Sequence, residues 1–167
     1  RPMPESPTRI PPADVAGPPR RAALVVNTAA GSLSSNPSGI ERLVAAVDEA
    51  GYAMAAPPRP DLPLDAQLAA ALAVRPELVF AIGGDGTIRA VAEHLAEHDI
   101  ILGILPGGTM NRLAARLDLP GDAEAAARSL AGAIPEPLAI GTLNGRVFLY
   151  QSIVGSPSRL VRFREMQ

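Results

Sequence analysis

The residues best suited to chemistry are five consecutive ones, Gly83-Gly84-Asp85-Gly86-Thr87, between an apolar run and a helical pattern. Glycines let the backbone approach a bulky anion, because no Cβ stands in the way. A helix start adds free N–H donors and the positive end of a dipole, which favour a phosphate group. A carboxylate would repel phosphate, so Asp85 fits such a site if it holds Mg²⁺ or takes a proton from an attacking hydroxyl. We therefore predict a nucleotide-phosphate site that transfers a phosphoryl group.

An ordinary tight turn between a strand and a helix is the simpler interpretation of these five residues. Turn geometry alone does not require three glycines together with an acid and a hydroxyl, so we favour the phosphate site. Thr87 is a candidate to cap the helix, to bind a phosphate, or to do both.

Two further loops carry residues of the same kinds. Pro106-Gly-Gly-Thr-Met-Asn111 also follows an apolar run and opens a helical pattern, and it offers Thr109 and Asn111 as polar ligands next to Gly108. Asn27 follows another apolar run, with Gly31 four residues later. For Asn27, an asparagine that satisfies its own loop is an equally good interpretation.

The three loops need a framework that brings them together, and the apolar pattern supplies one. Short apolar runs predict strands at 22–26, 52–56, 78–82 and 100–105, and helical periodicity follows at about 40–50, 64–74, 88–95, 110–117 and 122–130. This alternation predicts an α/β fold, a parallel sheet flanked by helices. Ligands of such sheets bind beyond the carboxyl ends of the strands, so loops 27–31, 83–87 and 106–111 should converge on one ligand.

The two ends of the chain depart from this pattern. Residues 1–21 carry seven prolines and are predicted to be a disordered leader, so the α/β nucleotide-binding domain is placed at 22–134. Residues 138–142 and 146–152 flank Asn144-Gly145, a strong hairpin signal, which predicts the start of a β-rich second domain at 135–167. Because the chain begins with Arg1 and ends in an Arg-rich stretch, we expect a longer protein in which that domain continues.

Composition excludes several classes of function. The net charge of −2 gives no sign of a nucleic-acid binder, and the absence of cysteine excludes disulfides and thiolate metal sites. All fifteen basic residues are arginine, which excludes a P-loop lysine. No apolar run approaches the roughly 20 residues of a membrane span. A cluster of Arg159, Arg162 and Arg164 suits peripheral contact with anionic lipid, although a solvated surface explains it equally well.

Taken together, the motifs resemble the catalytic domain of diacylglycerol kinases, in the form found in bacterial lipid kinases. The likeness is carried by Gly83–Thr87 followed by Leu105–Asn111, and it covers residues 22 to about 155. The Asn27…Gly31 loop stands where that family has Asn-Pro-x-x-Gly, and residues 140–148 resemble the start of its second domain. The resemblance implies a two-domain enzyme, with an α/β domain that binds ATP, a β-sandwich domain, and the lipid between them.

The resemblance also assigns roles to residues of this sequence. It implies that Asn27 and Gly31 contact the nucleotide and that Gly108, Thr109 and Asn111 complete its pocket. The phosphates and Mg²⁺ would be held by Gly83, Gly84, Asp85, Gly86 and Thr87. Asp85 is the candidate catalytic residue and the candidate metal contact, direct or through phosphate or water. Its role stays open between organising phosphate and metal and abstracting a proton.

Four residues depart from the family pattern. Thr28 replaces a proline, Met110 a small residue, Arg112 a common aspartate, and Ala139 an acidic residue that often precedes the hairpin. The last two would weaken a polar network near the site. The family's remaining catalytic acids lie outside this sequence, so we expect this chain alone to bind nucleotide poorly and not to turn over.

The sequence therefore predicts the nucleotide-binding domain of an ATP- and Mg²⁺-dependent lipid kinase, with a diacylglycerol- or sphingoid-type hydroxyl as acceptor. We expect a cytoplasmic protein with peripheral contact to a membrane, and the sequence leaves a homodimer open. One alternative is a kinase of the same superfamily that acts on NAD or a sugar phosphate. The other is a non-catalytic nucleotide-binding module, suggested by Arg112 and Ala139.

Overall fold

A computed structural model describes residues 20–28, 37–143 and 146–149 of the chain. The chain divides into two compact units between Pro137 and Leu138. Apart from Arg20 and Arg21, the predicted leader lies outside the described residues. Gly31 and the three C-terminal arginines of the predicted lipid contact also lie outside them.

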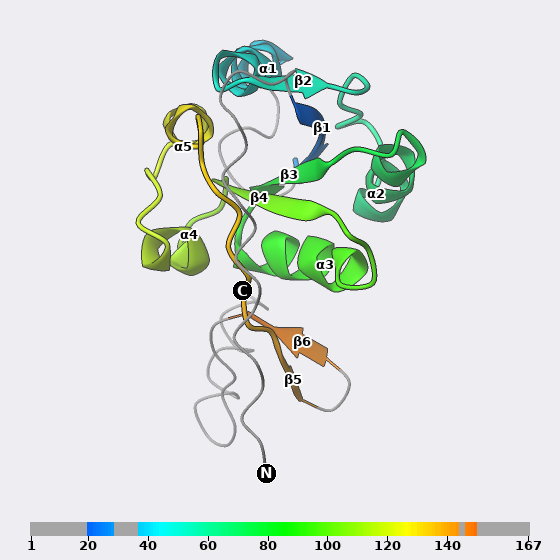
Figure 1. The fold of residues 1–167 in the computed structure, drawn as a ribbon, viewed down its shortest axis with the longest axis vertical. Coiled ribbons are helices and arrows are strands. Elements are labelled where there is room, and N and C mark those ends of the chain that lie inside the picture. Colours follow the sequence, from blue (N-terminus) through cyan, green and yellow to red (C-terminus); the bar gives the residue numbers. More distant parts are fainter. Residues whose placement is uncertain (1–19, 29–36, 144–145, 150–167) are drawn as a thin grey trace, which may run out of the picture. The chain divides into compact units, whose positions relative to one another are not determined.

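The first unit is built on a four-stranded parallel sheet. Its strands are β1 (Arg20–Val26), β2 (Tyr52–Met54), β3 (Leu78–Gly83) and β4 (Ile101–Pro106), in the spatial order β2-β1-β3-β4. The helices are α1 (Pro37–Glu49), α2 (Leu64–Ala73), α3 (Asp85–Leu95), α4 (Arg112–Arg116) and α5 (Ala123–Ser129). In Figure 1, α1 and α5 lie on one side of the sheet and α2 and α3 on the other. The predicted α/β fold is confirmed.

The sheet is apolar on both faces because helices cover both of them. Every residue of β3 is buried, as expected of a central strand in a parallel sheet. On one face, Phe80 and Leu105 belong to the same core cluster as Leu43 and Val47 of α1. Alternate residues such as Val79 point to the opposite face, which α2 and α3 cover.

The element boundaries differ from the sequence-based prediction where tertiary contacts decide them. β1 begins at Arg20 rather than Ala22, because Arg20 and Arg21 pair with β2. The helix predicted at 110–117 is shorter, since Asn111 has a left-handed backbone (φ 44°) that cannot continue a helix before Arg112. α5 is capped by Asp122, whose carboxylate accepts a hydrogen bond from the backbone of Ala125 at 2.8 Å.

The second unit is described through one antiparallel pair. β5 (Gly141–Leu143) pairs with β6 (Arg146–Phe148), with Gly141 opposite Phe148. The predicted hairpin is therefore confirmed, but its first strand is shorter than predicted because residues 138–140 are not part of it. The predicted turn residues Asn144 and Gly145 lie outside the described residues.

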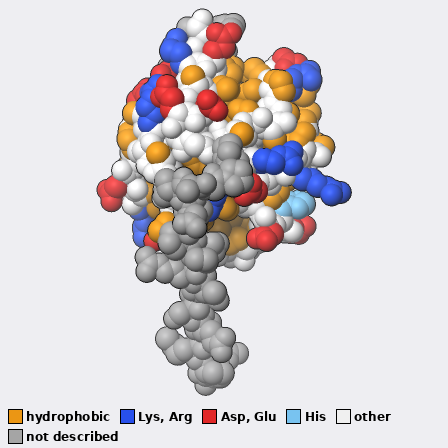
Figure 2. Space-filling view, turned by 45° about the horizontal axis from the view of Figure 1, so that its top comes forward, with side chains coloured by type: hydrophobic (Ala, Val, Ile, Leu, Met, Phe, Trp, Pro, Cys, Tyr) orange, Lys and Arg blue, Asp and Glu red, His pale blue; other side chains and the backbone are white. Residues whose placement is uncertain are grey.

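Charged side chains of both signs are interspersed on the face seen in Figure 2, outside the atoms drawn in grey. On the surface of the described residues, two arginines pair with glutamates of a neighbouring helix. Arg42 of α1 contacts Glu124 of α5 at 2.9 Å, and Arg128 of α5 contacts Glu49 of α1 at 2.6 Å. Surface pairs of this kind contribute about 0–1 kcal/mol each, so the apolar layer beneath them holds the helices in place. Within the described ranges, no helix has both the length and the apolar character needed to cross a membrane.

The close packing of β4 on β3 yields the first prediction. Gly103 lies opposite Phe80, and a Cβ added to Gly103 would come within 2.3 Å of the phenyl ring. Because both residues are buried, Gly103→Ala should lower the free energy of unfolding by about 1–3 kcal/mol, measured by urea denaturation. As a control, Gly121→Ala adds a methyl group where the described structure leaves open space, and it should change stability by less than about 0.5 kcal/mol. Equal stability of the two variants would contradict the packing.

Candidate active site

The three predicted loops emerge from the carboxyl ends of neighbouring strands. Asn27 follows β1, residues 83–87 begin at the last residue of β3, and residues 106–111 begin at the last residue of β4. These three strands are adjacent in the sheet. The chain leaves β1 towards α1 on one face and leaves β3 towards α3 on the other (Figure 1). In an open parallel sheet, ligands bind where the connections diverge in this way. The fold therefore brings the candidate residues to the expected binding position.

The glycine motif forms the junction between β3 and α3. β3 ends at Gly83, and α3 begins at Asp85 with Gly84 as its N-cap residue. No side chain of the described residues caps this helix, so the predicted capping role of Thr87 is wrong: Thr87 is the third residue of α3 and is only 5% exposed. As far as the described residues show, the first-turn amides of this eleven-residue helix have no capping side chain, so together with the helix dipole they can bind an anion.

Glycine is required where this junction meets the next loop. A Cβ on Gly108 would lie 2.4 Å from the Cα of Gly84, and one on Gly107 would lie 2.9 Å from the backbone nitrogen of Gly83. Gly107 also donates its N–H to the carbonyl of Gly83 at 3.0 Å. The loops after β3 and β4 thus touch through their backbones, with no room for a side chain on Gly107 or Gly108.

Gly86 differs from these glycines because protein packing does not explain it. Apart from its own helix and chain neighbours, no heavy atom of the described residues lies within 4 Å of a Cβ built on Gly86. A glycine inside a helix costs roughly 0.5–1 kcal/mol relative to alanine. The residue leaves open space in the first turn of α3, which is what the close approach of a ligand requires.

The loop after β1 is tied to the glycine motif by a side-chain hydrogen bond. Asn27 donates from Nδ2 to Oγ1 of Thr87 at 2.7 Å, and its backbone N–H donates to the carbonyl of Ile82 at 3.0 Å. The Thr87 side chain also packs over Gly83, where a Cβ would meet it at 2.6 Å. Asn27 and Thr87 therefore fix two loops against each other, and their contact with a nucleotide stays a prediction.

Asp85 and Asn111 hold the loop after β4. The two carboxylate oxygens of Asp85 accept hydrogen bonds from the backbone N–H groups of Arg112 and Leu113 at 3.1 and 3.0 Å, at the start of α4. Asn111 accepts from the N–H of Gly108 at 2.9 Å and donates to its carbonyl at 2.8 Å. The left-handed backbone of Asn111 makes this return contact compatible with the start of α4.

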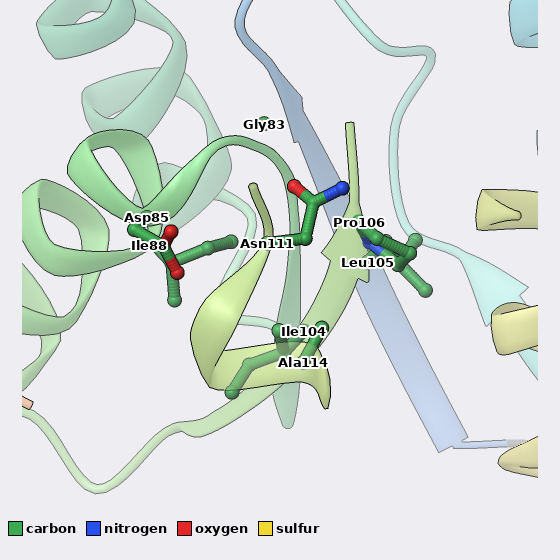
Figure 3. A pocket seen from close by; sticks show the side chains of 8 residues that line it. All are labelled: Gly83, Asp85, Ile88, Ile104, Leu105, Pro106, Asn111 and Ala114. Atoms are coloured by element: carbon green, nitrogen blue, oxygen red, sulfur yellow. The ribbon is translucent and has the colours of Figure 1, made fainter. Parts of the chain in front are cut away.

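Figure 3 shows how these residues lie around a small crevice. Asp85 is on α3, Asn111 is at the start of α4, and Leu105 and Pro106 come from the end of β4. Thr109 is exposed beside them. Among the described residues, no group of three or more His, Cys, Asp or Glu side chains is placed to hold a metal ion. Asp85 can still supply one carboxylate to Mg²⁺, which commonly takes its other ligands from phosphates and water.

Two residues that shape the site were missed by the sequence analysis. Gly107 was overlooked because only the structure shows how close it lies to Gly83. Gln67 of α2 is 5% exposed and bonds to the backbone of Val26, directly before Asn27. The available signal was a polar residue on the buried face of α2, next to Leu68.

The structure is an α/β domain that brings the candidate loops to one edge of a parallel sheet, and comparison with known proteins identifies its family. The diacylglycerol kinase catalytic domain matches residues 21–143, and the chain belongs to this family. A diacylglycerol kinase from Bacillus subtilis (strain 168) is 40% identical over 76 residues, which are 44% of this chain and 25% of that protein. A YegS-like protein of Pseudomonas aeruginosa (strain UCBPP-PA14), described as a probable lipid kinase, is 39% identical over 92 residues, 54% of this chain and 30% of the relative.

A solved structure shares the fold. A crystal structure described as a diacylglycerol kinase from Bacillus anthracis str. Sterne superposes with a TM-score of 0.61 at 24% identity, covering 78% of this chain and 46% of that one. The matches thus span a quarter to a third of the two curated relatives and about half of the solved chain.

At the contact between the two glycine loops, a Cβ would clash on Gly108 but not on Gly84, so alanine substitutions of these two glycines form a matched pair of variants. Gly108→Ala drives a methyl group into the backbone of Gly84, whereas a Cβ on Gly84 lies at an ordinary 3.5 Å from Gly108. Gly108→Ala should therefore lower the free energy of unfolding by about 1–3 kcal/mol, because backbone cannot yield as a flexible side chain does. Gly84→Ala should cost clearly less in the same denaturation experiment. Equal losses would show that the loops are not packed backbone to backbone.

Proposed function

We propose that this domain binds ATP with Mg²⁺ and transfers the γ-phosphoryl group to the hydroxyl of a diacylglycerol- or sphingoid-type lipid. The observation that carries the proposal is the open first turn of α3 at Gly86, which lies where three loops converge in a diacylglycerol kinase catalytic domain. A lipid acceptor requires the protein to meet a membrane surface. Peripheral contact from the cytoplasmic side is therefore part of the proposal.

In the proposed reaction, the acceptor oxygen forms a bond to the γ-phosphorus as the bond to the bridging oxygen breaks and ADP leaves. Such a transfer depends mainly on positioning and charge stabilisation, and it requires no covalent nucleophile. The amides at the start of α3 would bind phosphate oxygens, and Mg²⁺, when bound, neutralises charge on them. Asp85 would contact that ion directly or through water, or accept the proton of the hydroxyl.

The hydrogen bonds that Asp85 accepts from backbone amides are compatible with either role. Each carboxylate oxygen accepts one backbone hydrogen bond and keeps a second lone pair for a metal ion or a proton. The bond from residue 112 uses its backbone N–H, so the arginine at this position does not remove it. This observation favours the kinase over a non-catalytic module, which the departure at Arg112 had suggested.

The acceptor assignment is tested by measuring phosphate transfer from ATP in the full-length protein. We expect product with vesicles that contain diacylglycerol or a sphingoid base and none with NAD. Asp85→Asn should lower the rate at least about 100-fold, the usual cost of losing one charge-stabilising group. Asp122→Asn is the matched control, because asparagine caps helix α5 as well as aspartate does.

Three results would count against this assignment. Phosphorylation of NAD without lipid product would favour the related small-molecule kinases. ATP binding without transfer to any acceptor would favour a non-catalytic module. Wild-type rates in Asp85→Asn would overturn the role of that residue.

Gly86 gives a separate test of the phosphate site, because stability and binding should change in opposite directions. Gly86→Ala adds a methyl group in open space and improves helix propensity, so it should raise the free energy of unfolding by about 0.5–1 kcal/mol. The same methyl group should obstruct the nucleotide and weaken ATP binding about tenfold or more, measured by calorimetry. A stabilised variant that binds ATP as well as the wild type would place the phosphates elsewhere.

A further inference from the structure

Gln67 is a polar residue inside the apolar layer between α2 and the sheet. Its side-chain oxygen accepts a hydrogen bond from the N–H of Val26 at 2.8 Å. Its Nε2 donates to the carbonyls of Val26 and Leu62, both at 2.9 Å. The carbonyl oxygen and both N–H groups of this buried amide are therefore in use. Because all its hydrogen-bonding groups are used, the Gln67 side chain is held in one position and in turn holds the backbone of Val26 and Leu62.

The need for Gln67 arises from the shortness of β2. β2 pairs with only the first three residues of β1. The last of these, Ala22, directs its carbonyl towards the β2 side, where it accepts a hydrogen bond from the N–H of Ala55. Asn27, at the other end, donates to β3 instead. Because alternate residues of a strand direct their polar groups to opposite neighbours, Val26 faces the β2 side, beyond the end of β2. Val26 is 1% exposed, and Gln67 supplies the partner that a longer β2 would have supplied.

The residue that Gln67 holds lies next to the candidate site. Asn27 directly follows Val26 and donates to Thr87 at 2.7 Å, so the backbone is fixed by α2 just before the side chain that reaches α3. We propose that Gln67 is a positioning residue of the nucleotide site, acting through Asn27 and Thr87. This inference rests on the proposed function, since ATP is the ligand whose binding it affects.

A positioning role predicts a particular kinetic pattern. Gln67 would contact neither ATP nor the acceptor, so its loss should displace Asn27 and weaken ATP binding more than it slows the transfer. Loss of Thr87 as a hydrogen-bond acceptor should have the same effect by the same route. The two substitutions should therefore be non-additive, as expected of residues that act through one network.

The experiment uses the full-length protein with Gln67→Met, Thr87→Val and the double variant. Gln67→Met should raise the KM for ATP about tenfold, the effect expected if the hydrogen bond from Asn27 to Thr87 is lost, with kcat close to wild type. The double variant should be no worse than the more impaired single one. Hydrogen exchange, measured independently of activity, should show faster exchange of the Val26 amide in Gln67→Met.

Two further variants keep the test decisive. Tyr52→Phe is the control, because it also removes a hydrogen bond, the partly buried one from the Tyr52 hydroxyl to the carbonyl of Leu130 at 3.0 Å, away from the site. It should leave the KM for ATP unchanged. Gln67→Asn keeps the amide but is one methylene shorter, and it replaces Gln67→Met if that variant does not fold.

The outcomes separate this inference from the proposed function. An unchanged KM for ATP despite faster exchange at Val26 would make Gln67 purely structural and overturn the inference alone. Additive effects of the two substitutions would also overturn it. A wild-type protein that binds no ATP would overturn the proposed function and this inference together.

Discussion

The site depends on a contact between two stretches of backbone. The loops that follow β3 and β4 touch at Gly84 and Gly108, where a Cβ added to Gly108 would lie 2.4 Å from the Cα of Gly84. Adjacent parallel strands are only about 4.8 Å apart, so loops that leave them side by side must either diverge or consist of residues without side chains where they touch. Here the residues that touch are glycines. The hydrogen bond from Gly107 to Gly83 continues the pairing of the two strands into the loops.

Polar side chains then stabilise this backbone contact through hydrogen bonds. They are the same side chains that are expected to bind a ligand. Asp85 bonds to the start of α4, Asn111 to Gly108, and Asn27 to Thr87. The loops are thereby held in one arrangement before a ligand arrives, which lowers the entropic cost of binding. Among the described residues, the backbone of the first turn of α3 beside Gly86 is left uncovered. A site of this construction suits an anion better than a neutral molecule.

The sequence predicted what depends on local pattern and missed what depends on distant partners. Apolar runs and helical periodicity identified the strands and helices, and glycine with Asp, Asn and Thr marked the loops that the fold brings to one edge of the sheet. The pattern did not separate Gly108, which packing requires, from Gly86, which packing does not explain, because the difference lies in a neighbouring strand. Gln67 was missed for a similar reason, since its partner Val26 lies 41 residues earlier. The shift of β1 to Arg20 likewise follows from pairing with β2.

The backbone hydrogen bonds that Asp85 accepts give this residue a structural role in addition to its proposed role in the reaction. A carboxylate that only bound metal could be placed by α3 alone, but this one also receives the first amides of α4. A change in the charge of Asp85 would therefore alter the loop after β4 as well as the proposed metal contact. The same carboxylate thus joins the candidate site to the start of α4, and both proposed roles of Asp85, metal contact and proton acceptor, depend on this arrangement.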